Sequence, residues 1–329
     1  GAKAYLSGVV GNDEAQKILF KELERKNIDT SCIIKTSKPT IQKIRGLARQ
    51  HLLYHQHMLR IDYEDTKSIT KDDEQKLFSL IKQKINLFDA IILSDYAKGT
   101  LNENLVKSLI QLSKENNKIV TADCKPINFE FYKNVDLLKP NKKEAIEMTL
   151  TENIEEAGKK LVQKLNSSIV ITKGAEGFSI FEKNNNIFHL PTNVKEVYDV
   201  AGAGDTVMAV LTIALLSNYS LKEAVELADR AAGIVISKPG VEVISKEELE
   251  SSFNSKIKVV SKDWGQEEWI VNNEKYCGKK MLIKQGYYCS YHMHKIKEET
   301  FYVLDGELEL IHEGKYLKVR TGETLHLKP

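Results

Sequence analysis

The chain has 329 residues, of which 42% are hydrophobic and 29% charged, a composition that supports packed cores and argues against disorder. Its 48 basic and 46 acidic residues are well mixed and give a formal charge of +2, so no basic block indicates nucleic-acid binding. No apolar run approaches the length of a membrane span, and we expect no signal peptide. The four scattered cysteines form no CxxC pair, which favours reduced thiols and a cytoplasmic protein.

The first 250 residues alternate between short β-rich runs and amphipathic stretches. Strands are predicted at 4–10, 90–93, 118–122, 135–138 and 168–172, and helices at 13–26, 102–115, 154–165 and 221–237. Strands that alternate with helices predict a parallel sheet with helices on both faces. Residues 35–66 break this pattern, and their extended character predicts a β-rich lid or edge structure.

The character of the sequence changes after Glu250. Residues 251–255 are polar and are predicted to form a linker. Short alternating strands and glycine turns then continue to the last residue, without a helical pattern, and predict a small all-β unit. We therefore expect two domains, at 1–255 and 256–329.

The most informative segment is glycine-rich and runs from Asp199 to Thr206. Small residues allow backbone N–H groups to surround an anion, and the apolar helix predicted from Val207 adds its positive end. Asp205 falls in the first turn of that helix. Phosphoryl transfer needs this combination, because a base must accept the proton of the attacking hydroxyl while N–H donors stabilise the transferred group. The alternative is a glycine-rich turn with a capping aspartate.

Polar residues also follow several predicted strands, at 94–99, 123–126, 141–144 and 172–177. Ligands bind at the carboxyl ends of strands in open α/β sheets, so these segments are expected to gather around one site. Any single one of them is ordinary turn chemistry, but the series is hard to explain in that way. No Walker A pattern is present, which excludes a P-loop enzyme.

Together these segments resemble the ribokinase-like sugar kinases. Residues 199–205 stand where that superfamily carries its Asp-Thr-x-Gly-Ala-Gly-Asp signature, and two further motifs match at Asn141-x-x-Glu144 and Thr172-x-Gly174-x-x-Gly177. Within the superfamily, the strings at 94–99 (Ser-Asp-Tyr-Ala-Lys-Gly), 59–64 and 196–200 are similar to those of D-glycero-β-D-manno-heptose 7-phosphate kinases. Another ribokinase-like carbohydrate kinase is the alternative.

The resemblance implies an enzyme that uses ATP and Mg²⁺ to phosphorylate the sugar phosphate at O1, giving the 1,7-bisphosphate used for ADP-heptose and the lipopolysaccharide core. It also implies a homodimer. The roles that it implies are a base (Asp205), N–H donors to the phosphoryl group (Ala201, Gly202, Ala203, Gly204), ligands that organise Mg²⁺ (Asn141, Glu144) and residues that border ATP (Thr172, Gly174, Gly177).

Four residues are candidates for contacts to the sugar phosphate. Asp95 and Lys98 lie in the string at 94–99, and Arg60 or Arg45 could meet the phosphate that the sugar already carries, although solvated surface cations are an equal alternative.

Two departures from the family pattern matter. Ala201 stands just before Gly-Ala-Gly, where the family usually carries a threonine, and the first strand and sugar-contacting glycine segment of the family have no counterpart before residue 1. We therefore expect an N-terminally incomplete kinase with weak activity or none.

The last 70 residues carry the spacing Gly286-x5-His292-x-His294-x4-Glu299-x6-Gly306. Histidines two apart on a strand point to one side, and a carboxylate returning from the next strand would complete a site for Zn²⁺, Fe²⁺, Mn²⁺ or Ni²⁺. The alternative is a solvent-facing histidine pair.

With Trp264-Gly265, residues 301–306 and residues 322–329, this spacing resembles a cupin, most closely the small cupins related to phosphomannose isomerase. The resemblance implies an activity of sugar-phosphate isomerase type, and the alternative is a sugar-binding or regulatory module without chemistry. Because the second cupin motif is cut at Pro329, we expect a partial barrel.

Overall fold

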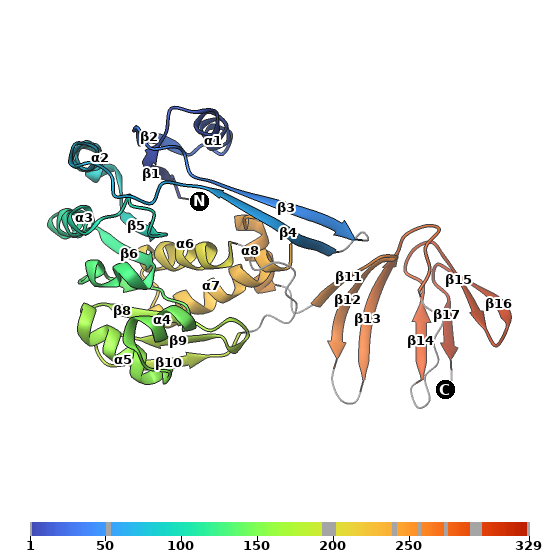
Figure 1. The fold of residues 1–329 in the computed structure, drawn as a ribbon. Coiled ribbons are helices and arrows are strands. Elements are labelled where there is room, and N and C mark those ends of the chain that lie inside the picture. Colours follow the sequence, from blue (N-terminus) through green and yellow to red (C-terminus); the bar gives the residue numbers. More distant parts are fainter. Residues whose placement is uncertain are drawn as a thin grey trace. The chain divides into compact units, whose positions relative to one another are not determined.

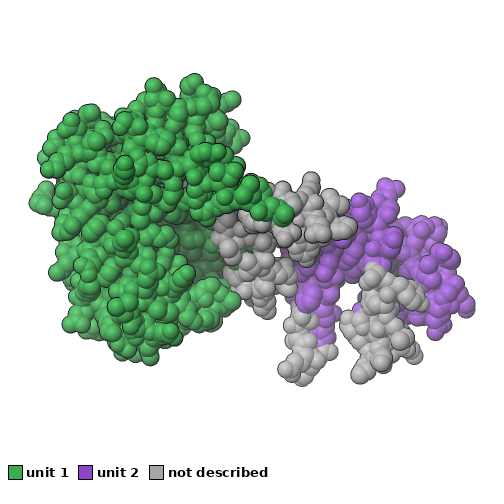
Figure 2. All heavy atoms as spheres, viewed as in Figure 1, with its two compact units in different colours: residues 1–253 green, residues 254–329 purple. Residues whose placement is uncertain are grey.

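The computed structural model describes residues 2–50, 54–192, 202–238, 242–254, 258–272, 276–289 and 298–327. They form two compact units, residues 1–253 and 254–329, shown in green and purple in Figure 2. The division falls beside the boundary expected at 255.

The first unit alternates strands and helices through most of its length (Figure 1). Its strands are β1 (Tyr5–Val10), β2 (Asp29–Lys35), β3 (Gln42–Gln50), β4 (Tyr54–Tyr63), β5 (Ala90–Asp95), β6 (Ile119–Cys124), β7 (Leu137–Leu138), β8 (Ser168–Thr172), β9 (Phe178–Phe181) and β10 (Ile187–Leu190). Its helices are α1 (Glu14–Arg25), α2 (Lys71–Lys84), α3 (Glu103–Glu115), α4 (Lys142–Thr149), α5 (Ile154–Leu165), α6 (Ala203–Leu216), α7 (Leu221–Ile236) and α8 (Lys246–Asn254), with short 3-10 turns at Ile85–Leu87, Pro126–Tyr132 and Gly174–Glu176.

A six-stranded sheet in the order β10-β9-β8-β7-β6-β5 forms the centre of this unit. Strands β5 to β8 pair in parallel, as predicted, but β9 and β10 are antiparallel, so the expectation of an all-parallel sheet is wrong at this edge. The reason is the short loop that separates β8 from β9. A parallel connection needs a crossover of a dozen or more residues, whereas a turn closed by Gly177 at φ +82° reverses the chain.

Helices cover both faces of the sheet, as predicted. Side chains alternate along each buried strand, so that Ile169 and Ile171 belong to one apolar cluster and Val170 to the other. The first cluster includes residues of α2, α3, α4 and α5, and the second includes residues of α6 and α7. A buried hydrogen bond of 2.7 Å between the hydroxyls of Thr121 on β6 and Thr212 on α6 fixes that helix against the sheet.

Two smaller β elements precede the sheet. Strands β1 and β2 pair in parallel, and the N-cap of α1 is Asp13, whose carboxylate accepts hydrogen bonds from the backbone N–H groups of Gln16 and Thr40. Strands β3 and β4 form the long antiparallel hairpin drawn in blue in Figure 1, with a bulge after Gly46. The extended structure predicted for residues 35–66 is therefore present as a projecting hairpin.

The linker predicted at 251–255 is wrong for residues 251–254, which form the end of α8. Ser245 and Glu248 exchange hydrogen bonds between their side chains and backbone N–H groups, and this reciprocal cap begins the helix. Phe253 then packs under the Arg230 guanidinium, 4.9 Å from the ring centroid. Of the polar residues that suggested a linker, Ser251 is exposed and Ser252 is half-buried at the end of this capped helix, and Ser255 lies outside the described residues.

In the second unit the described elements are all strands, which confirms the all-β prediction. They are β11 (Lys258–Lys262), β12 (Gly265–Asn272), β13 (Cys277–Ile283), β14 (Glu299–Tyr302), β15 (Glu307–His312), β16 (Lys315–Arg320) and β17 (Thr324–Leu327). All pairs are antiparallel, in three separate groups: β11-β12-β13, β14-β17 and β15-β16. Among the described strands these groups do not join into a closed barrel.

Candidate active site

Helix α6 begins without a side-chain cap. Gly202 is its N-cap at φ +82°, a left-handed conformation that favours glycine, and no side chain of the described residues caps the helix. Among the described residues no acceptor pairs with the backbone N–H groups of Ala203 and Gly204, and such groups at a helix N-terminus can bind an anion. Residues 199–201 of the signature lie outside the described residues. Asp205 is in the first turn, so the sequence prediction of a carboxylate beside a helix N-terminus matches the geometry.

Asp205 meets a residue of the loop after β5. The Tyr96 hydroxyl donates a hydrogen bond of 3.0 Å to Oδ1 of Asp205. Burial, followed by the nearby charge of Asp205, raises the pKa of Tyr96 to about 12, so the hydroxyl keeps its proton at neutral pH. The ammonium groups of Lys43 and Lys125 lie 5.2 and 5.8 Å from the centroid of the Tyr96 ring. Tyr96 thus links the expected base to two cations that the sequence did not single out.

Asn141 and Glu144 form the capping box of α4. Oδ1 of Asn141 accepts from the Glu144 backbone N–H at 2.9 Å, and Oε2 of Glu144 accepts from the Asn141 backbone N–H at 3.0 Å. The second carboxylate oxygen of Glu144 accepts from the Lys125 ammonium at 2.7 Å. Both residues predicted to organise Mg²⁺ therefore lie together at a strand end, and both also stabilise the start of a helix.

The loop after β8 lies beside this capping box. Asn141 forms an isolated parallel bridge with Thr172, whose backbone N–H donates to the Pro140 carbonyl at 3.0 Å. The following turn has Gly174 at φ +58°. The three residues predicted to border ATP, which include Gly177, thus lie in one turn next to the predicted Mg²⁺ ligands.

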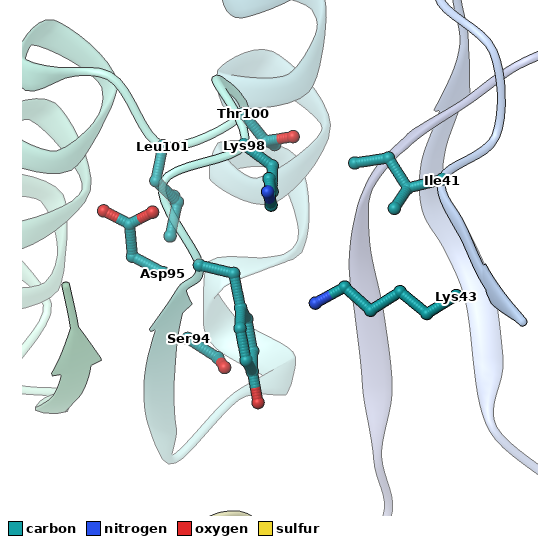
Figure 3. A pocket seen from close by; sticks show the side chains of 8 residues that line it. Ile41, Lys43, Ser94, Asp95, Lys98, Thr100 and Leu101 are labelled. Carbon is teal, nitrogen blue, oxygen red and sulfur yellow. The ribbon is translucent and has the colours of Figure 1, made fainter. Parts of the chain in front are cut away.

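A pocket of about 260 Å³ opens between the loop after β5 and strand β3 (Figure 3). Its lining comprises Ile41, Lys43, Ser94, Asp95, Tyr96, Lys98, Thr100 and Leu101. Figure 3 shows Lys43 reaching from β3 toward the loop, with Lys98 on the other side of the gap. Lys98 forms an ion pair of 2.5 Å with Glu64, whereas no described residue forms an ion pair with Lys43. Two ammonium groups on opposite walls suit an anionic ligand.

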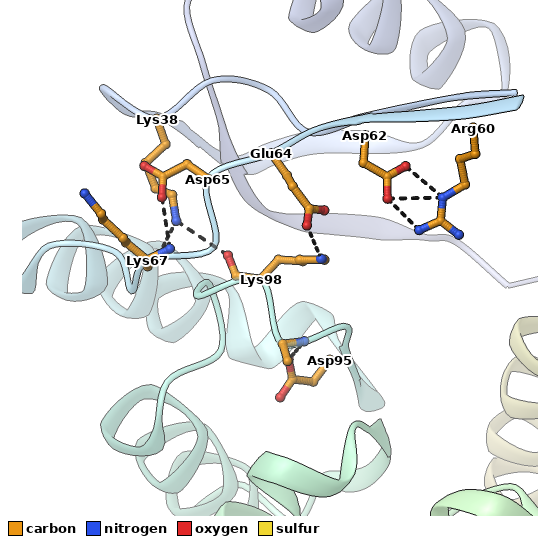
Figure 4. A network of polar contacts seen from close by, with 9 residues as sticks. Lys38, Arg60, Asp62, Glu64, Asp65, Lys67, Asp95 and Lys98 are labelled. Carbon is orange, nitrogen blue, oxygen red and sulfur yellow. Dashed lines mark hydrogen bonds and ion pairs between the residues drawn. The ribbon is translucent and has the colours of Figure 1, made fainter.

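The predicted sugar-phosphate contacts differ in their surroundings (Figure 4). Asp95 is buried, and its carboxylate accepts hydrogen bonds from the Ala97 backbone N–H at 2.7 Å, Asn128 Nδ2 at 2.8 Å and the Tyr132 hydroxyl at 2.8 Å. Arg60 lies on β4, where its guanidinium binds Asp62, with Nε 2.8 Å from Oδ1. Of these predicted contacts, Asp95 and Lys98 line the pocket and Arg60 does not.

Sequence reasoning missed Lys43 and Lys139 and did not choose Asp123 or Lys125 from the segments that it noted. Lys43 on β3 and Ile41, two residues before it, both line the pocket, and period-two alternation in the extended segment could have indicated Lys43. Lys139 forms an ion pair of 2.7 Å with Asp123 of the neighbouring strand end. Such a contact depends on strand order, which the sequence alone does not give.

The metal site predicted in the second unit cannot be built from the part of the chain that is described. His292 and His294 lie outside it, and Glu299 is the first residue of β14, opposite Leu327. Among described residues no group of three or more His, Cys, Asp or Glu side chains could hold a metal ion.

The four cysteines are free, in line with the prediction of reduced thiols. No described helix is long and apolar enough to cross a bilayer.

Residues 1–248 match the profile of the pfkB family carbohydrate kinases. The chain belongs to the pfkB family. The match covers the uncapped glycine turn, the capping-box motif and the pocket, and it identifies the first unit as a carbohydrate kinase domain. The C-terminal β strands lie beyond the matched residues.

Curated relatives of this pfkB protein are named "Bifunctional protein HldE". Those from Histophilus somni (strain 129Pt) and Haemophilus influenzae (strain ATCC 51907 / DSM 11121 / KW20 / Rd) are 39% and 37% identical to this chain over 257 and 256 residues, and each match spans 76% of the chain. These matches cover 52% of each relative, so the chain spans about half the length of the curated relatives it matches.

Solved structures agree with the pfkB fold. Phosphofructokinase-2 from Escherichia coli in complex with potassium superposes with a TM-score of 0.62 at 17% identity, over 77% of this chain and 82% of that chain. Arabidopsis thaliana ribokinase complexed with ribose and ATP gives a TM-score of 0.58 at 18% identity, over 76% and 81%. At these identities the likeness shows the ribokinase-like fold alone.

Proposed function

We propose that the pfkB unit transfers the γ-phosphoryl group of ATP to O1 of D-glycero-β-D-manno-heptose 7-phosphate, for ADP-heptose and lipopolysaccharide core synthesis. The observation that carries the proposal is the position of Asp205 in the first turn of an uncapped helix, hydrogen-bonded to Tyr96. Tyr96 belongs to the string at 94–99 that resembles the heptose kinases. The similarity to the HldE proteins supports the same substrate class.

In this mechanism Asp205 accepts the proton of the O1 hydroxyl as that oxygen forms its bond to the γ-phosphorus and the bond to ADP breaks. The N–H groups at the start of α6 stabilise the negative charge on the transferred group. The hydroxyl of the sugar would take the place beside Asp205 that the Tyr96 hydroxyl holds in this structure. Lys43 and Lys98 would meet the 7-phosphate in the pocket.

The surroundings of Asn141 and Glu144 fit a hydrated Mg²⁺ ion. Hard cations prefer oxygen ligands, and Mg²⁺ keeps several of its waters. Both carboxylate oxygens of Glu144 already accept hydrogen bonds, so Glu144 would hold the ion through its waters. When bound, Mg²⁺ would neutralise charge on the phosphates of ATP.

The test is Asp205→Asn, which keeps the shape of the side chain and removes the base. We expect kcat to fall by at least about 10³-fold while ATP affinity is retained, because only the proton acceptor is lost. Asp72→Asn, on the exposed side of α2, is the matched control and should leave both unchanged. Activity of Asp205→Asn within about tenfold of the unmodified chain would contradict the assignment. Equal turnover of ribose and heptose 7-phosphate would favour a different carbohydrate kinase.

Two further proposals concern assembly and the second unit. Exposed apolar side chains of the hairpin, among them Ile44, Leu59 and Ile61, support a homodimer that covers them, and light scattering would measure it. The spacing from Gly286 to Gly306 supports a cupin that binds a divalent transition metal, of sugar-phosphate isomerase type or a non-catalytic sugar-binding module. Metal analysis of the chain before and after His292→Ala tests the metal.

A further inference from the structure

A buried ammonium group lies directly beneath the first turn of α6. Lys139 follows β7 and is only 3% exposed. Lysine is almost never buried to this extent unless its charge is paired. The pairing partner is Asp123 near the end of β6, with Oδ2 2.7 Å from Nζ. The ion pair thus bridges two neighbouring strand ends inside the site rather than at the protein surface.

The Lys139 ammonium faces the glycine turn. A methyl group added at Gly204 would lie 3.6 Å from Nζ of Lys139, and no other described atom would come within 4 Å of it outside the helix and the neighbouring residues. Because Gly204 has no side chain, no side chain of the described residues separates the ammonium group from the backbone that carries the first-turn N–H groups. The helix N-terminus and the ammonium group therefore present positive charge from the same side.

The other charged groups of the site shift the pKa of Asp123. Burial raises the pKa of the Asp123 carboxyl, Lys139 opposes that rise, and the Glu144 and Asp205 carboxylates add to it. The ion pair therefore lies within electrostatic range of both Asp205 and the capping box of α4. In a partly desolvated site such charges interact more strongly than they would in water.

Positive charge next to a helix N-terminus is unfavourable until an anion binds there, and it becomes more favourable as that anion gains charge. A group arranged in this way stabilises a transferring phosphoryl group more than it stabilises bound nucleotide. We infer that Lys139 is a positioning residue for phosphoryl transfer, held by Asp123, whose ammonium group supports the anion-binding turn of α6 from behind. The inference rests on the proposed kinase activity, and it assigns to Lys139 a role through the turn rather than a contact with substrate.

The variant must remove the charge without leaving a buried carboxylate unpaired. Lys139→Met alone would leave Asp123 facing Glu144 and Asp205, and loss of one partner of a buried pair is strongly destabilising. The double variant Lys139→Met/Asp123→Asn removes both charges, preserves side-chain size and leaves the net charge unchanged. The matched control is Lys159→Met/Glu155→Gln, which neutralises an exposed ion pair of 2.6 Å on α5.

Two measurements test the inference on the full chain. In steady-state kinetics with heptose 7-phosphate, we expect kcat of the double variant to fall about 100-fold and KM for ATP to change less than about threefold. In calorimetry without turnover, orthovanadate in the presence of Mg²⁺ and ADP should bind about 100-fold more weakly, whereas ADP alone should bind as before. The control variant should match the unmodified chain in both.

Each contrary result has a distinct meaning. A folded double variant with kcat within about threefold of the unmodified chain would overturn the inference, as would equal losses of ADP and vanadate affinity, which indicate a structural ion pair. If the unmodified chain phosphorylates another sugar but not heptose 7-phosphate, the proposed function fails, and the vanadate comparison still decides the role of Lys139. An unmodified chain that binds ADP but shows no vanadate binding would overturn the inference.

Discussion

The carboxylate of Asp95 is expected to hold the loop after β5 in place, and removing it should destabilise the first unit. Asp95 is 5% exposed and accepts three hydrogen bonds, from the Ala97 backbone N–H, Asn128 and Tyr132. The Tyr132 hydroxyl belongs to a fully buried residue, so leaving it without an acceptor should cost about 1–3 kcal/mol. The other two donors are partly exposed and can turn to water, at about 0.5–1.5 kcal/mol each. Asp95→Ala should therefore lower the free energy of unfolding by roughly 4 kcal/mol, within a range of about 2–6.

The positions of the tryptophans allow the unfolding of the first unit to be measured separately. Both tryptophans, Trp264 and Trp269, lie in the second unit, whereas every described helix begins in the first. In a urea titration, the helical circular dichroism signal therefore follows the first unit, and tryptophan fluorescence follows the second. Asp95→Ala should shift the first transition to lower urea and leave the second unchanged. Tyr132→Phe, which removes one donor and its bond to a charged acceptor, should lower the free energy of unfolding by about 1.5–3 kcal/mol.

A different outcome would show that this reasoning is wrong. If Asp95→Ala raised KM for the sugar phosphate while the dichroism midpoint stayed the same, the carboxylate would be a substrate contact and its three donors would find other partners. A double-mutant cycle between Asp95→Asn and Tyr132→Phe adds an independent check, with an expected coupling of about 1–2 kcal/mol. Strict additivity would mean that the two groups do not interact in solution.

Two more predictions concern glycine and pH. Gly99→Ala should destabilise the first unit by more than about 2 kcal/mol, because Gly99 has φ +82° and an added methyl would overlap the Lys67 carbonyl; an unchanged urea midpoint would contradict this. Hydrogen bonds from Thr40, and then from Gln16, hold the pKa of Asp13 below its usual range. The charged carboxylate therefore stabilises the folded protein at pH values above the pKa that Asp13 has in the unfolded chain. This stabilisation is lost as the pH falls through the lower pKa that Asp13 has in the folded protein. Asp13→Ala should therefore be less stable at neutral pH, with a difference that shrinks between about pH 5 and pH 2 in acid titrations of both chains.

Local signals in the sequence predict most helices and strands of the first unit, but fewer of the pairings between its strands. The bounds of α5 and β8 agree with the prediction residue for residue, because helical periodicity and a continuous apolar run are properties of the segment itself. The antiparallel β9 depends on a turn closed by Gly177, which reads from the sequence as part of a phosphate loop. Helix α8 was missed because its short cap lies in a polar stretch.

The same division holds for the candidate site. Of the motif positions, Asn141 lies after β7 as the N-cap of α4, and Asp205 lies in the first turn of α6, the turn in which the sequence places it. The cations of the site come from elsewhere in the fold: Lys43 from a hairpin that faces the loop after β5, and Lys139 from a strand whose neighbour supplies Asp123. These contacts depend on how distant segments pack, which composition and spacing do not specify.

The capping box of α4 has a consequence for the evolution of such chains. Asn141 and Glu144 begin a helix whether or not a nucleotide binds, so selection for folding alone would preserve their spacing. A descendant that had lost catalysis would therefore keep this motif, while Asp205, which accepts a hydrogen bond from Tyr96, would be replaced by other residues. With Asp205 as the proposed base, position 205 rather than positions 141 and 144 would distinguish active from inactive copies in a genome that carries several.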